Sequence, residues 1–473
     1  MPKSRCWTFI LLASLLAACT QGPSGSPAAK ARLAETNQDF RLIINSAKAK
    51  VFPAVAFIKV VQQDYGVGEK TSREISGSGV IISPKGEVLT NWHVVDKAIE
   101  VRCLLFDGRA MDAKVLGSDK DTDLALIQLL PASAPGATTQ PGNLAEFNYA
   151  KLGDSRKLQE GDFVMAMGAP WGLSRSVSLG IISCTKRYLP NTSEYSIWLQ
   201  TDAAISPGNS GGPLVNTDGE VIGINTRGMM AGGDMGFAVP SETILPVITQ
   251  IREAGKVNWS WTGLQFQPLK DFNRNVYFEG NDGVIVAETD PESPARRAGI
   301  QPRDRILKVN GKAISAITDE DLPDLRRYLG SLPKNTPAIL EVLRGTSKTP
   351  INITLTPREK GQVEGDSFAC TRWDCTVKTI NQFDNPDLYF QRKQGVFVDG
   401  IKYPGNANSS GLEQQDIILK IDGQAINTLA DLQNVHKTSL GTIKDKPRVV
   451  VQVLRNGLMR QVVLDISRDY SKE

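Results

Sequence analysis

The residues in this chain that could do chemistry include one serine, Ser210, in the glycine-rich stretch "GNSGGP" between Gly208 and Pro213. A serine hydroxyl is a weak nucleophile, and it needs an adjacent base that a third group orients. A glycine turn of this kind is also common in ordinary loops, so its meaning depends on the rest of the chain. Only two histidines, His93 and His436, are available as the base.

His93 is the better candidate for that base. It lies in "LTNWHVV", at the end of an expected strand, whereas His436 lies in "DLQNVHKTSL", where we expect a helix and an exposed structural role. Downstream, "DKDTDLALIQL" places Asp123 directly before a strand that reads as buried. Packing can fix a carboxylate there, so that it accepts a hydrogen bond from the His93 ring. Asp119 and Asp121, in the turn before it, are the solvated alternatives.

If Ser210 is a nucleophile, the need for glycine at the positions around it can be explained. The order His, Asp, Ser on a β-rich segment, with Gly-x-Ser-Gly-Gly at the end, is that of the chymotrypsin-like double β-barrel. There Gly208 lets the backbone turn so that its N–H and that of Ser210 converge on the oxyanion, and Asn209 completes the predicted oxyanion hole. Gly211 and Gly212 leave room for the chain to pass close behind the nucleophile.

Short strands must position these residues. From about Val51 to Pro240 the sequence is a string of β-branched and apolar runs, such as "VAFIKVV", "GSGVIIS" and "DFVMAMG", broken by Gly, Asn and Asp. This pattern predicts an all-β barrel or sandwich. Strands that alternate with long amphipathic helices are missing, which disfavours an α/β hydrolase. A helix is expected from Ser241 to Ala254, where apolar residues recur at helical spacing before Gly255, and it would close this domain.

The last third of the chain contains an internal repeat. The stretch "GVIVAETDPESPARRAGIQPRDRILKVNGKAI", from Gly283, aligns without gaps on "GVFVDGIKYPGNANSSGLEQQDIILKIDGQAI", from Gly395. Two copies with a period of about 110 residues mean duplicated small domains, because solenoid repeats are far shorter. Each copy reads as strand, short helix, strand, helix and strand, and resembles a PDZ domain.

A PDZ fold binds an extended C-terminus by strand addition at a sheet edge. In the first copy "WTGLQF" resembles the carboxylate-binding loop and edge strand, so Thr262, Gly263 and Leu264 form the predicted PDZ carboxylate loop. The second copy is divergent, because it has no equally clear loop before its core. A spacer or oligomerisation module remains the alternative for both copies.

Four motifs together carry a family resemblance: "TNWHVV", "DLALIQL", "TDAAISPGNSGGPLVNTDGEVIGINT" and "GFAVPS". With the two repeats they resemble the HtrA/Deg family of trypsin-fold serine proteases. The resemblance implies a mainly β fold, a chymotrypsin-like double β-barrel followed by two PDZ domains. On matching positions it makes His93 the general base and later acid, Asp123 its orienting partner and Ser210 the nucleophile.

The family resemblance also implies features of assembly and control. The segment "TKRYLPNTSEYS", residues 185–196, takes the place of the loop that senses a PDZ ligand or a neighbouring protomer. A homotrimer, or multiples of one, would form through the N-terminal segment of the barrel, where Phe52 and Phe57 lie. Core packing explains these two aromatic residues equally well. The segment "QQDYGVGEKTSRE" is short, so we expect this chain to lack the long inhibitory loop of some family members.

Substrate preference follows partly from the residue types near the serine. In trypsin-like pockets an acidic residue six positions before the nucleophile selects basic side chains, and here that position is Ala204. By resemblance, Ile205 and the segment "GMMAGGDMGF" line the S1 pocket, with Met229 and Met235 as wall residues. Isoleucine and the flexible methionine predict small to medium aliphatic P1 residues.

The N-terminus has the layout of a secretory signal. Lys3 and Arg5 precede an apolar run of about a dozen residues, which is too short to span a bilayer as a helix. The run ends in Leu-Ala-Ala-Cys19, which resembles a bacterial lipobox, so Cys19 is the predicted lipidation site. A signal peptide or anchor with a chance cysteine is the alternative. We therefore expect a lipid-anchored, periplasm-facing protein, and Thr20 favours the outer membrane over the inner.

Composition and cysteine usage bear on nucleic-acid binding, metal or cofactor binding and disulfide formation. Lys plus Arg total 54 against 51 for Asp plus Glu, so the net charge of +3 gives no footprint for nucleic acid. With two histidines in the chain no metal is expected, and no cofactor is predicted. The spacing Cys370-x4-Cys375 leaves a disulfide and two free thiols as equal possibilities.

We divide the chain into five segments. These are a signal peptide (1–18), a tether (19–45), a trypsin-like protease domain (46–255), a first PDZ domain (258–358) and a second, divergent one (365–468).

The predicted function is that of an ATP-independent serine endopeptidase of the cell envelope. It degrades misfolded or damaged proteins, and C-terminal peptides that bind to a PDZ domain regulate it. Two alternatives remain: a regulatory protease that cuts one signalling substrate, and a non-proteolytic chaperone or scaffold. The three triad residues favour a protease, but the sequence does not separate quality control from a dedicated substrate.

Overall fold

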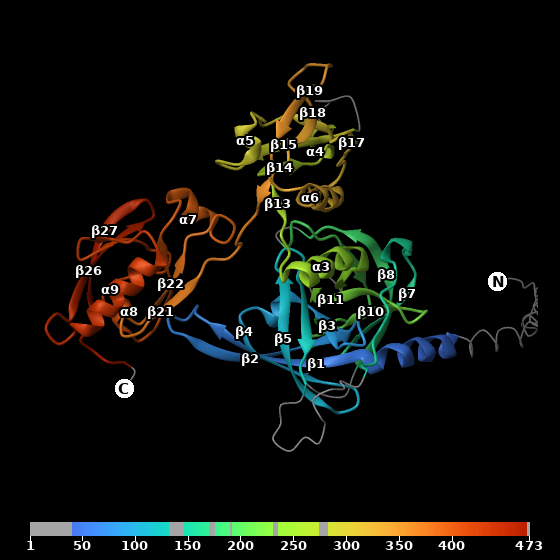
Figure 1. The fold of residues 1–473 in the computed structure, drawn as a ribbon, viewed down its shortest axis with the longest axis horizontal. Helices are drawn as coiled ribbons and strands as arrows, with labels where there is room; N and C mark the ends of the chain where they lie inside the picture. Colours follow the sequence, from blue (N-terminus) through green and yellow to red (C-terminus); the bar gives the residue numbers. More distant parts are fainter. Residues whose placement is uncertain are drawn as a thin grey trace, which may run out of the picture.

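The computed structural model describes residues 40–131, 146–169, 176–189, 192–229, 235–273 and 282–470. The fold is mainly β, as predicted: two closed six-stranded barrels are followed by two smaller β-sheet domains (Figure 1). Cys19 and the predicted signal peptide lie outside the described residues. Across the described segments, no helix combines the length and the apolar character needed to cross a membrane.

The first barrel follows a helix at residues 40–51 and the 3-10 turn η1 (Phe52–Ala54). Its strands, in pairing order, are β1 (Val55–Asp64), β2 (Thr71–Ile81), β3 (Glu87–Thr90), β6 (Leu124–Leu129), β5 (Ala110–Asp119) and β4 (Ala98–Leu104). Apolar residues such as Ile58 and Val60 alternate with exposed Lys59 along β1, which is the pattern of a strand with one buried face. β6 is buried along nearly its whole length, as "DLALIQL" predicts.

The second barrel follows the 3-10 turn η2 (Ser155–Lys157). Its strands, in pairing order, are β10 (Pro213–Asn216), β11 (Val221–Met229), β12 (Met235–Pro240), β9 (Trp198–Thr201), β8 (Ser176–Arg187) and β7 (Phe163–Gly168). Helix α3 (Ser241–Ala254) then follows with the predicted bounds. It ends at Gly255, whose φ of 68° is the left-handed conformation that glycine adopts freely at a helix C-terminus. α3 contacts β5 and β6 of the first barrel and β11 and β12 of the second, so it joins the two.

The first PDZ-like domain is an antiparallel sheet. Its strands, in pairing order, are β14 (Leu264–Gln267), β15 (Val284–Thr289), β16 (Arg305–Val309), β18 (Ala338–Leu343) and β19 (Ile351–Leu355), with β17 (Lys312–Ala313) on β16. A separate pair, β13 (Ser260–Trp261) and β20 (Arg358–Glu359), joins its two ends. Its helical segments are α4 (Lys270–Asn273), α5 (Pro294–Arg297), η4 (Asp319–Asp321) and α6 (Leu322–Gly330).

The second PDZ-like domain repeats this plan. Its strands, in pairing order, are β21 (Ser367–Cys370), β22 (Cys375–Thr379), β23 (Val396–Ile401), β24 (Ile417–Ile421), β26 (Arg448–Arg455) and β27 (Leu458–Asp465), with β25 (Gln424–Ala425) on β24. Its helices are α7 (Pro386–Gln391), α8 (Asn406–Ser409) and α9 (Leu429–Gly441).

The repeat detected in the sequence has the same physical basis in both copies. Asp304 and the matching Asp416 are almost fully buried. Each is neutralised by an arginine from a later strand: Arg344 Nη2 lies 2.7 Å from Asp304, and Arg455 Nη2 lies 2.6 Å from Asp416. A buried carboxylate needs such a partner, which accounts for the aspartate at the same place in each copy.

The described residues form three main hydrophobic cores. The first runs through both barrels and α3 and includes Trp259, the second belongs to the first PDZ-like sheet, and the third to the second. Because Trp259 packs with the barrels, the protease core extends past Gly255 into the start of the predicted PDZ segment. The five segment boundaries themselves stay a prediction.

The second PDZ-like domain answers one question that the sequence left open and contradicts one expectation. Cys370 and Cys375 face each other across the β21–β22 pair as buried free thiols, and burial raises the pKa of Cys370 well above its usual value. His436 was expected to be exposed, which is wrong: only 5% of its surface is accessible. Its Nε2 lies 2.8 Å from the Thr371 carbonyl, and its ring packs edge-on against Trp373. Burial lowers the pKa of His436, so it is a structural residue of this core.

Candidate active site

His93 and Asp123 are brought together at the edge of the first barrel. His93 lies in the one-turn helix α2 (Trp92–Val95), directly after β3. Its Nδ1 is 2.9 Å from each carboxylate oxygen of Asp123, and its backbone N–H donates to the same carboxylate at 3.1 Å. This double contact fixes the ring orientation and leaves Nε2 as the nitrogen for other chemistry.

Asp123 is held in place by a residue that sequence reasoning missed. Asp123 has a positive φ of 56° and is only 6% exposed. The fully buried Asn91 donates its amide to the Asp123 carbonyl at 3.0 Å and to Thr226 Oγ1 at 3.1 Å. Asn91 thereby ties the segment before His93 to β6 and to β11 of the other barrel. Its only sequence signal is its place two residues before the histidine in "TNWHVV".

Ser210 lies in the loop before β10, at the junction of the two barrels. Its hydroxyl donates to the Thr226 carbonyl at 2.8 Å, and its own carbonyl accepts from the Ser78 N–H of β2 at 2.7 Å. Among the described contacts there is no hydrogen bond between Ser210 and His93. The structure therefore places the serine between strands of the two barrels, with its hydroxyl directed at β11.

The loop that precedes Ser210 is anchored by Ser78, a second residue that sequence reasoning missed. Ser78 Oγ donates to the Gly208 carbonyl at 2.6 Å and accepts from the Ala169 N–H at 2.8 Å. Gly208 has a φ of 99°, which an L side chain rarely adopts. Of the three predicted oxyanion-hole amides, that of Asn209 is engaged, since it donates to the Ser206 carbonyl at 2.9 Å.

The glycines after the serine are required by close packing. A Cβ atom on Gly211 would lie 2.1 Å from the Ser78 carbonyl oxygen, and one on Gly212 would lie 2.1 Å from the Met167 carbonyl oxygen. Neither backbone can move without breaking strands of the two barrels. The "GNSGGP" stretch is therefore a point where three chain segments pass in contact.

The predicted S1 residues are partly described. Ile205 packs against the second barrel, beside Gly236 and its strand partner Gly228. A Cβ on Gly236 would lie 2.8 Å from Ile205 Cδ1, so the absence of side chains there makes room for the isoleucine. Met235 is half-buried, whereas the side chain of Met229 and residues 230–234 lie outside the described part.

Comparison with known proteins decides the family. Residues 77–224 match the trypsin-like peptidase domain, and residues 285–344 and 380–466 match PDZ domains. The chain is 35% identical over 83% of its length to a probable periplasmic serine endoprotease, DegP-like, of Pseudomonas savastanoi pv. phaseolicola, covering 78% of that protein. It is 33% identical over 86% of its length to the periplasmic serine endoprotease DegP of Escherichia coli (strain K12), covering 80% of it.

The chain belongs to the DegP/HtrA family of serine endoproteases.

Solved structures support the same assignment. The HtrA-type protease AlgW with tripeptide matches with a TM-score of 0.57 and 31% identity, over 67% of this chain and 97% of that one. AlgW with decapeptide matches with a TM-score of 0.55 and 29% identity, over 67% and 98%. This DegP/HtrA protein is thus a serine endopeptidase, and its named relatives place it in the periplasm or cell envelope.

The turn before Asp123 corrects one expectation. Asp119 and Asp121 were expected to be solvated, but Asp119 is 7% exposed and accepts from Thr122 Oγ1 at 2.6 Å and from Trp259 Nε1 at 3.2 Å. Burial, together with the nearby Asp121 charge, raises the pKa of Asp119 to about 6. Asp121 is ion-paired with Lys360 at 2.7 Å.

The predicted sensing segment of this HtrA-family chain lies between the protease and the first PDZ domain. Ser193 Oγ donates to the Asp121 carbonyl, in the turn that leads to Asp123. The Tyr195 ring stacks on Trp259, with 4.6 Å between centroids, and the Tyr195 carbonyl accepts from Arg327 of α6 at 2.9 Å. Pro190 and Asn191 lie outside the described residues.

The predicted PDZ carboxylate loop leads into β14, whose first residue is Leu264, at the edge of the first PDZ sheet. Thr262 and Leu264 are 7% and 8% exposed, and Gly263 between them has a φ of 72°. A Cβ on Gly263 would lie 2.1 Å from the Ser293 side chain, so the turn depends on glycine. The described hydrogen bonds pair β14 with β15 on one side only.

Proposed function

We propose that His93, Asp123 and Ser210 act together as a catalytic triad. The observation that best supports this is the His93–Asp123 contact, since it holds the ring with Nδ1 against the carboxylate and leaves Nε2 as the base. Ser210 is the nucleophile, on the loop that Ser78 anchors. Its hydroxyl turns from the Thr226 carbonyl towards Nε2 before it attacks.

The reaction then follows the order of serine protease chemistry. Ser210 Oγ attacks the scissile carbonyl carbon as its proton passes to His93 Nε2, and the carbonyl oxygen becomes an oxyanion. The N–H groups of Gly208 and Ser210 stabilise that oxyanion, and donors of this kind contribute about 3 kcal/mol each. His93 then protonates the leaving amine, the peptide C–N bond breaks, and an acyl-enzyme remains. Water, deprotonated by His93, hydrolyses the ester and restores the serine.

The S1 pocket accepts small to medium aliphatic P1 residues. Support comes from Ala204, which places no charge at the position that selects basic side chains, and from Ile205, which fills space beside Gly228 and Gly236. An apolar side chain in this place favours an apolar substrate residue of limited size.

The substrates are misfolded or damaged proteins of the cell envelope, and cleavage is independent of ATP. A peptide with a free C-terminus binds the first PDZ domain at Thr262, Gly263 and Leu264 and raises activity. Support comes from AlgW, a structural neighbour solved with a tripeptide and with a decapeptide. The Arg327–Tyr195 hydrogen bond offers a route from this domain to the turn before Asp123.

Two further features of the proposal concern location and assembly. Cys19 carries a lipid that tethers the protein to a membrane, the outer one by preference, with the protease facing the periplasm. The protein assembles as a homotrimer or multiples of it through its N-terminal segment. Exposed Leu42 and Ile43, at 64% and 44%, offer an apolar surface just before Phe52.

A regulatory protease with one signalling substrate is the second candidate. The contacts between the first PDZ domain, the sensing segment and the turn before Asp123 favour it, because they link the proposed ligand-binding domain to the turn that precedes the proposed catalytic aspartate.

The deciding experiment is cleavage of casein and of a denatured protein by the chain from Gln21. It is compared with the Ser210→Ala chain, with and without C-terminal hydrophobic peptides. Cleavage that the substitution abolishes and that peptide stimulates supports a PDZ-regulated protease. A folded wild-type chain that cleaves neither substrate under any condition argues against general quality control and favours the dedicated substrate.

A further inference from the structure

A cavity of about 680 Å³ lies where the protease and both PDZ domains meet. The protease lines it with the sensing segment, including Tyr188 and Glu194, and the first PDZ domain with β14 and α6. The third wall comes from the second PDZ domain and includes Phe383, Tyr389 and Phe390. A peptide bound at the first PDZ domain therefore enters a space that a second PDZ domain encloses.

The first PDZ domain supplies the apolar floor of this cavity. Leu264 and Phe266 of β14 and Leu329 of α6 line it, and each is less than a tenth exposed. Within the described sheet β14 pairs only with β15, so its outer edge can accept a peptide strand. This part is the groove to which the proposed regulation already assigns the C-terminal carboxylate.

The second PDZ domain supplies a wall of aromatic side chains and a lysine. Phe390 is 81% exposed at the end of α7, and its ring lines the cavity. Lys393 is exposed and lies 4.4 Å above the Tyr389 ring, and it pairs with no carboxylate among the described residues. Phe383 packs edge-on against Trp261, directly before the carboxylate loop, with 5.9 Å between centroids.

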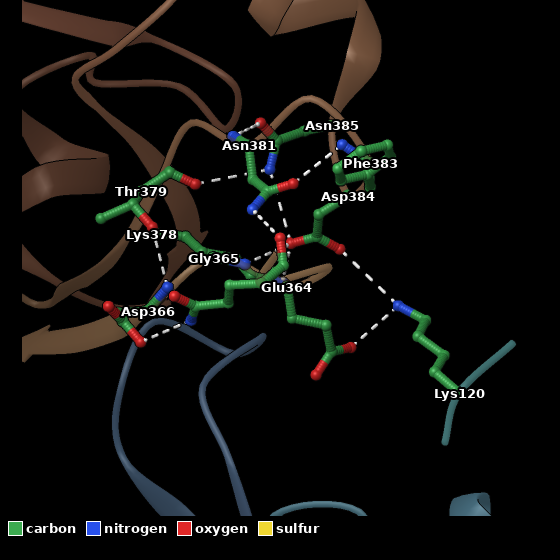
Figure 2. Close-up of polar contacts among 11 residues, drawn as sticks. Lys120, Glu364, Gly365, Asp366, Lys378, Thr379, Asn381, Phe383, Asp384 and Asn385 are labelled. Carbon is green, nitrogen blue, oxygen red and sulfur yellow. Dashed lines mark hydrogen bonds and ion pairs between the residues drawn. The ribbon is translucent and has the colours of Figure 1, made fainter. Parts of the chain in front are cut away.

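Polar contacts hold this wall in position. Lys120 of the protease reaches both Glu364 and, in the second PDZ domain, Asp384 (Figure 2). Its Nζ lies 2.8 Å from Glu364 and 3.8 Å from Asp384, and Asp384 also pairs with Lys378 at 2.7 Å. The burial of Asp384 is offset by these two cations, which keep the pKa of its carboxyl below the usual value. The segment that carries α7 is thus fixed to the turn that precedes the proposed catalytic aspartate.

Backbone packing at a second point reinforces this placement. The turn between β1 and β2 lies against β23 so closely that a Cβ on Gly68 would be 2.0 Å from the Lys402 nitrogen. Thr376 Oγ1 donates to the Tyr65 carbonyl, and Lys402 pairs with Glu69 at 2.7 Å. With two separate attachment points, the second PDZ domain is oriented on the protease, so α7 keeps its place beside the first PDZ groove.

We propose that the peptide site is composite. The first PDZ domain binds the terminal carboxylate and the last, apolar residue of a peptide, and side chains at α7 of the second PDZ domain contact the peptide residues upstream of these. The occupant is a C-terminal segment with an aromatic or large apolar residue for Phe390 and an acidic residue for Lys393. This rests on the proposed peptide binding at the first PDZ domain. It gives the divergent second repeat a role in ligand selection that needs no carboxylate loop of its own.

The test measures binding of labelled peptides by fluorescence anisotropy to the chain from Gln21 carrying Ser210→Ala, which leaves the peptide intact. Two probes are used. The first is a decapeptide that ends in valine with a free carboxylate and carries a phenylalanine and a glutamate upstream. The second is the tripeptide formed by its last three residues. Phe390→Ala should weaken decapeptide binding about 3- to 10-fold, the range expected for one aromatic contact, and leave tripeptide binding unchanged. Leu458→Ala, which removes an exposed apolar side chain that does not line the cavity, is the matched control.

A charge exchange separates recognition from a structural effect. Lys393→Glu should weaken binding of the glutamate decapeptide and strengthen that of the same peptide with lysine in place of glutamate, and both changes should shrink at high salt. Equal affinity of decapeptide and tripeptide, with no effect of Phe390→Ala or Lys393→Glu, would overturn the composite site and leave the proposed regulation intact. If the Ser210→Ala chain with Phe390 and Lys393 unchanged bound neither peptide, both the composite site and the proposed peptide binding at the first PDZ domain would be overturned. The proteolytic role of Ser210 is tested separately, by cleavage of a denatured protein.

Discussion

The ammonium group of Lys360, in the connection between the two PDZ domains, lies 2.7 Å from the carboxylate of Asp121, two residues before Asp123. Their side chains are only 7% and 17% exposed. Lys360 Nζ also lies 5.0 Å from the centroid of the Tyr195 ring and 5.2 Å from that of Phe383. One buried cation therefore touches the turn before the proposed catalytic aspartate, the sensing segment and the second PDZ domain.

Replacement of Lys360 by methionine should destabilise the protein and uncouple peptide binding from activity. The change leaves the Asp121 carboxylate buried without its cation, which costs on the order of 3 kcal/mol when the pair is well enclosed. Thermal unfolding and peptide-stimulated cleavage measure the two effects. The double variant Lys360→Met with Asp121→Asn should recover most of the stability, because the Asp121 position then carries no buried charge and the other partner of Lys360, Glu194, is exposed to solvent. A single variant with wild-type stability and stimulation would contradict this role.

Asp123→Asn should lower kcat by about 10⁴-fold with little change in fold, because the amide no longer holds the His93 ring in the state that accepts the serine proton. The measurement is steady-state cleavage of a fluorogenic peptide, with circular dichroism to check the fold. Asp119→Asn is the matched comparison, since Asp119 lies in the same turn but does not contact the histidine. Full activity of Asp123→Asn would remove this residue from the proposed triad.

Ser78→Ala should lower kcat more than it changes KM. Its hydroxyl joins the Gly208 carbonyl to the Ala169 N–H, so its loss frees the loop that presents the oxyanion donors. Loss of a donor itself costs 10²- to 10³-fold, and loss of its support should cost less, on the order of tenfold. Ser176→Ala, whose hydroxyl contacts only Asn209 in this loop, serves as the control. The proposal fails here if both alanine variants have the same kcat as the wild type.

Ile205→Ala should broaden the P1 preference towards larger apolar residues. The isoleucine fills space beside Gly228 and Gly236, and its truncation leaves a hollow that a leucine or phenylalanine side chain can enter. A single methylene group of fit in an apolar pocket corresponds to roughly a 10- to 200-fold change in the ratio of kcat/KM values. Cleavage of a peptide series that differs only at P1 measures this ratio. An unchanged ratio between valine and phenylalanine would place Ile205 outside the S1 pocket.

The stability contribution of Asp119 should depend on pH. Its pKa is raised to about 6 in the folded protein, so the folded state binds the proton more tightly than the unfolded chain. Its contribution is therefore fully present below the unfolded pKa, near 4, and is lost as the pH rises through about 6. Relative to wild type, Asp119→Asn should gain roughly 1 to 3 kcal/mol of unfolding free energy between pH 4.5 and 7.5.

Urea unfolding of both chains at the two pH values checks the Asp119 prediction. Asp121→Asn gives a useful comparison, because the loss of its charge should itself bring the Asp119 pKa down. A stability difference between Asp119→Asn and wild type that is the same at both pH values would mean that the folded pKa of Asp119 is ordinary.

Local patterns in the sequence predicted much of the fold of this protein. The strand pattern, helix α3 and the duplicated small domains follow from hydrophobic periodicity and turn residues, which act over a few positions. The paired Asp304 and Asp416 were visible because a duplication repeats the same buried charge in the same place. His93 and Asp123 could be paired because so few histidines offered an alternative.

The contacts made at long range were not visible in the same way. Asn91 and Ser78 look like ordinary polar residues near strands, and their roles depend on partners in the other barrel. Asp119 and Asp121 read as solvated turn residues, since nothing nearby in the chain indicates that Trp259 and Lys360 cover them.

The sequence by itself therefore determined the order of the proposed catalytic residues, the β-rich protease domain and the two repeats. Each of these depends on residue types at short and regular spacing. Only the tertiary structure decided that the Ser210 hydroxyl is directed at Thr226, that Lys360 is buried at the meeting point of three domains, and that Phe390 lines the same cavity as Leu264. These relationships arise from packing between segments hundreds of residues apart, where burial and charge compensation, rather than local pattern, select the arrangement.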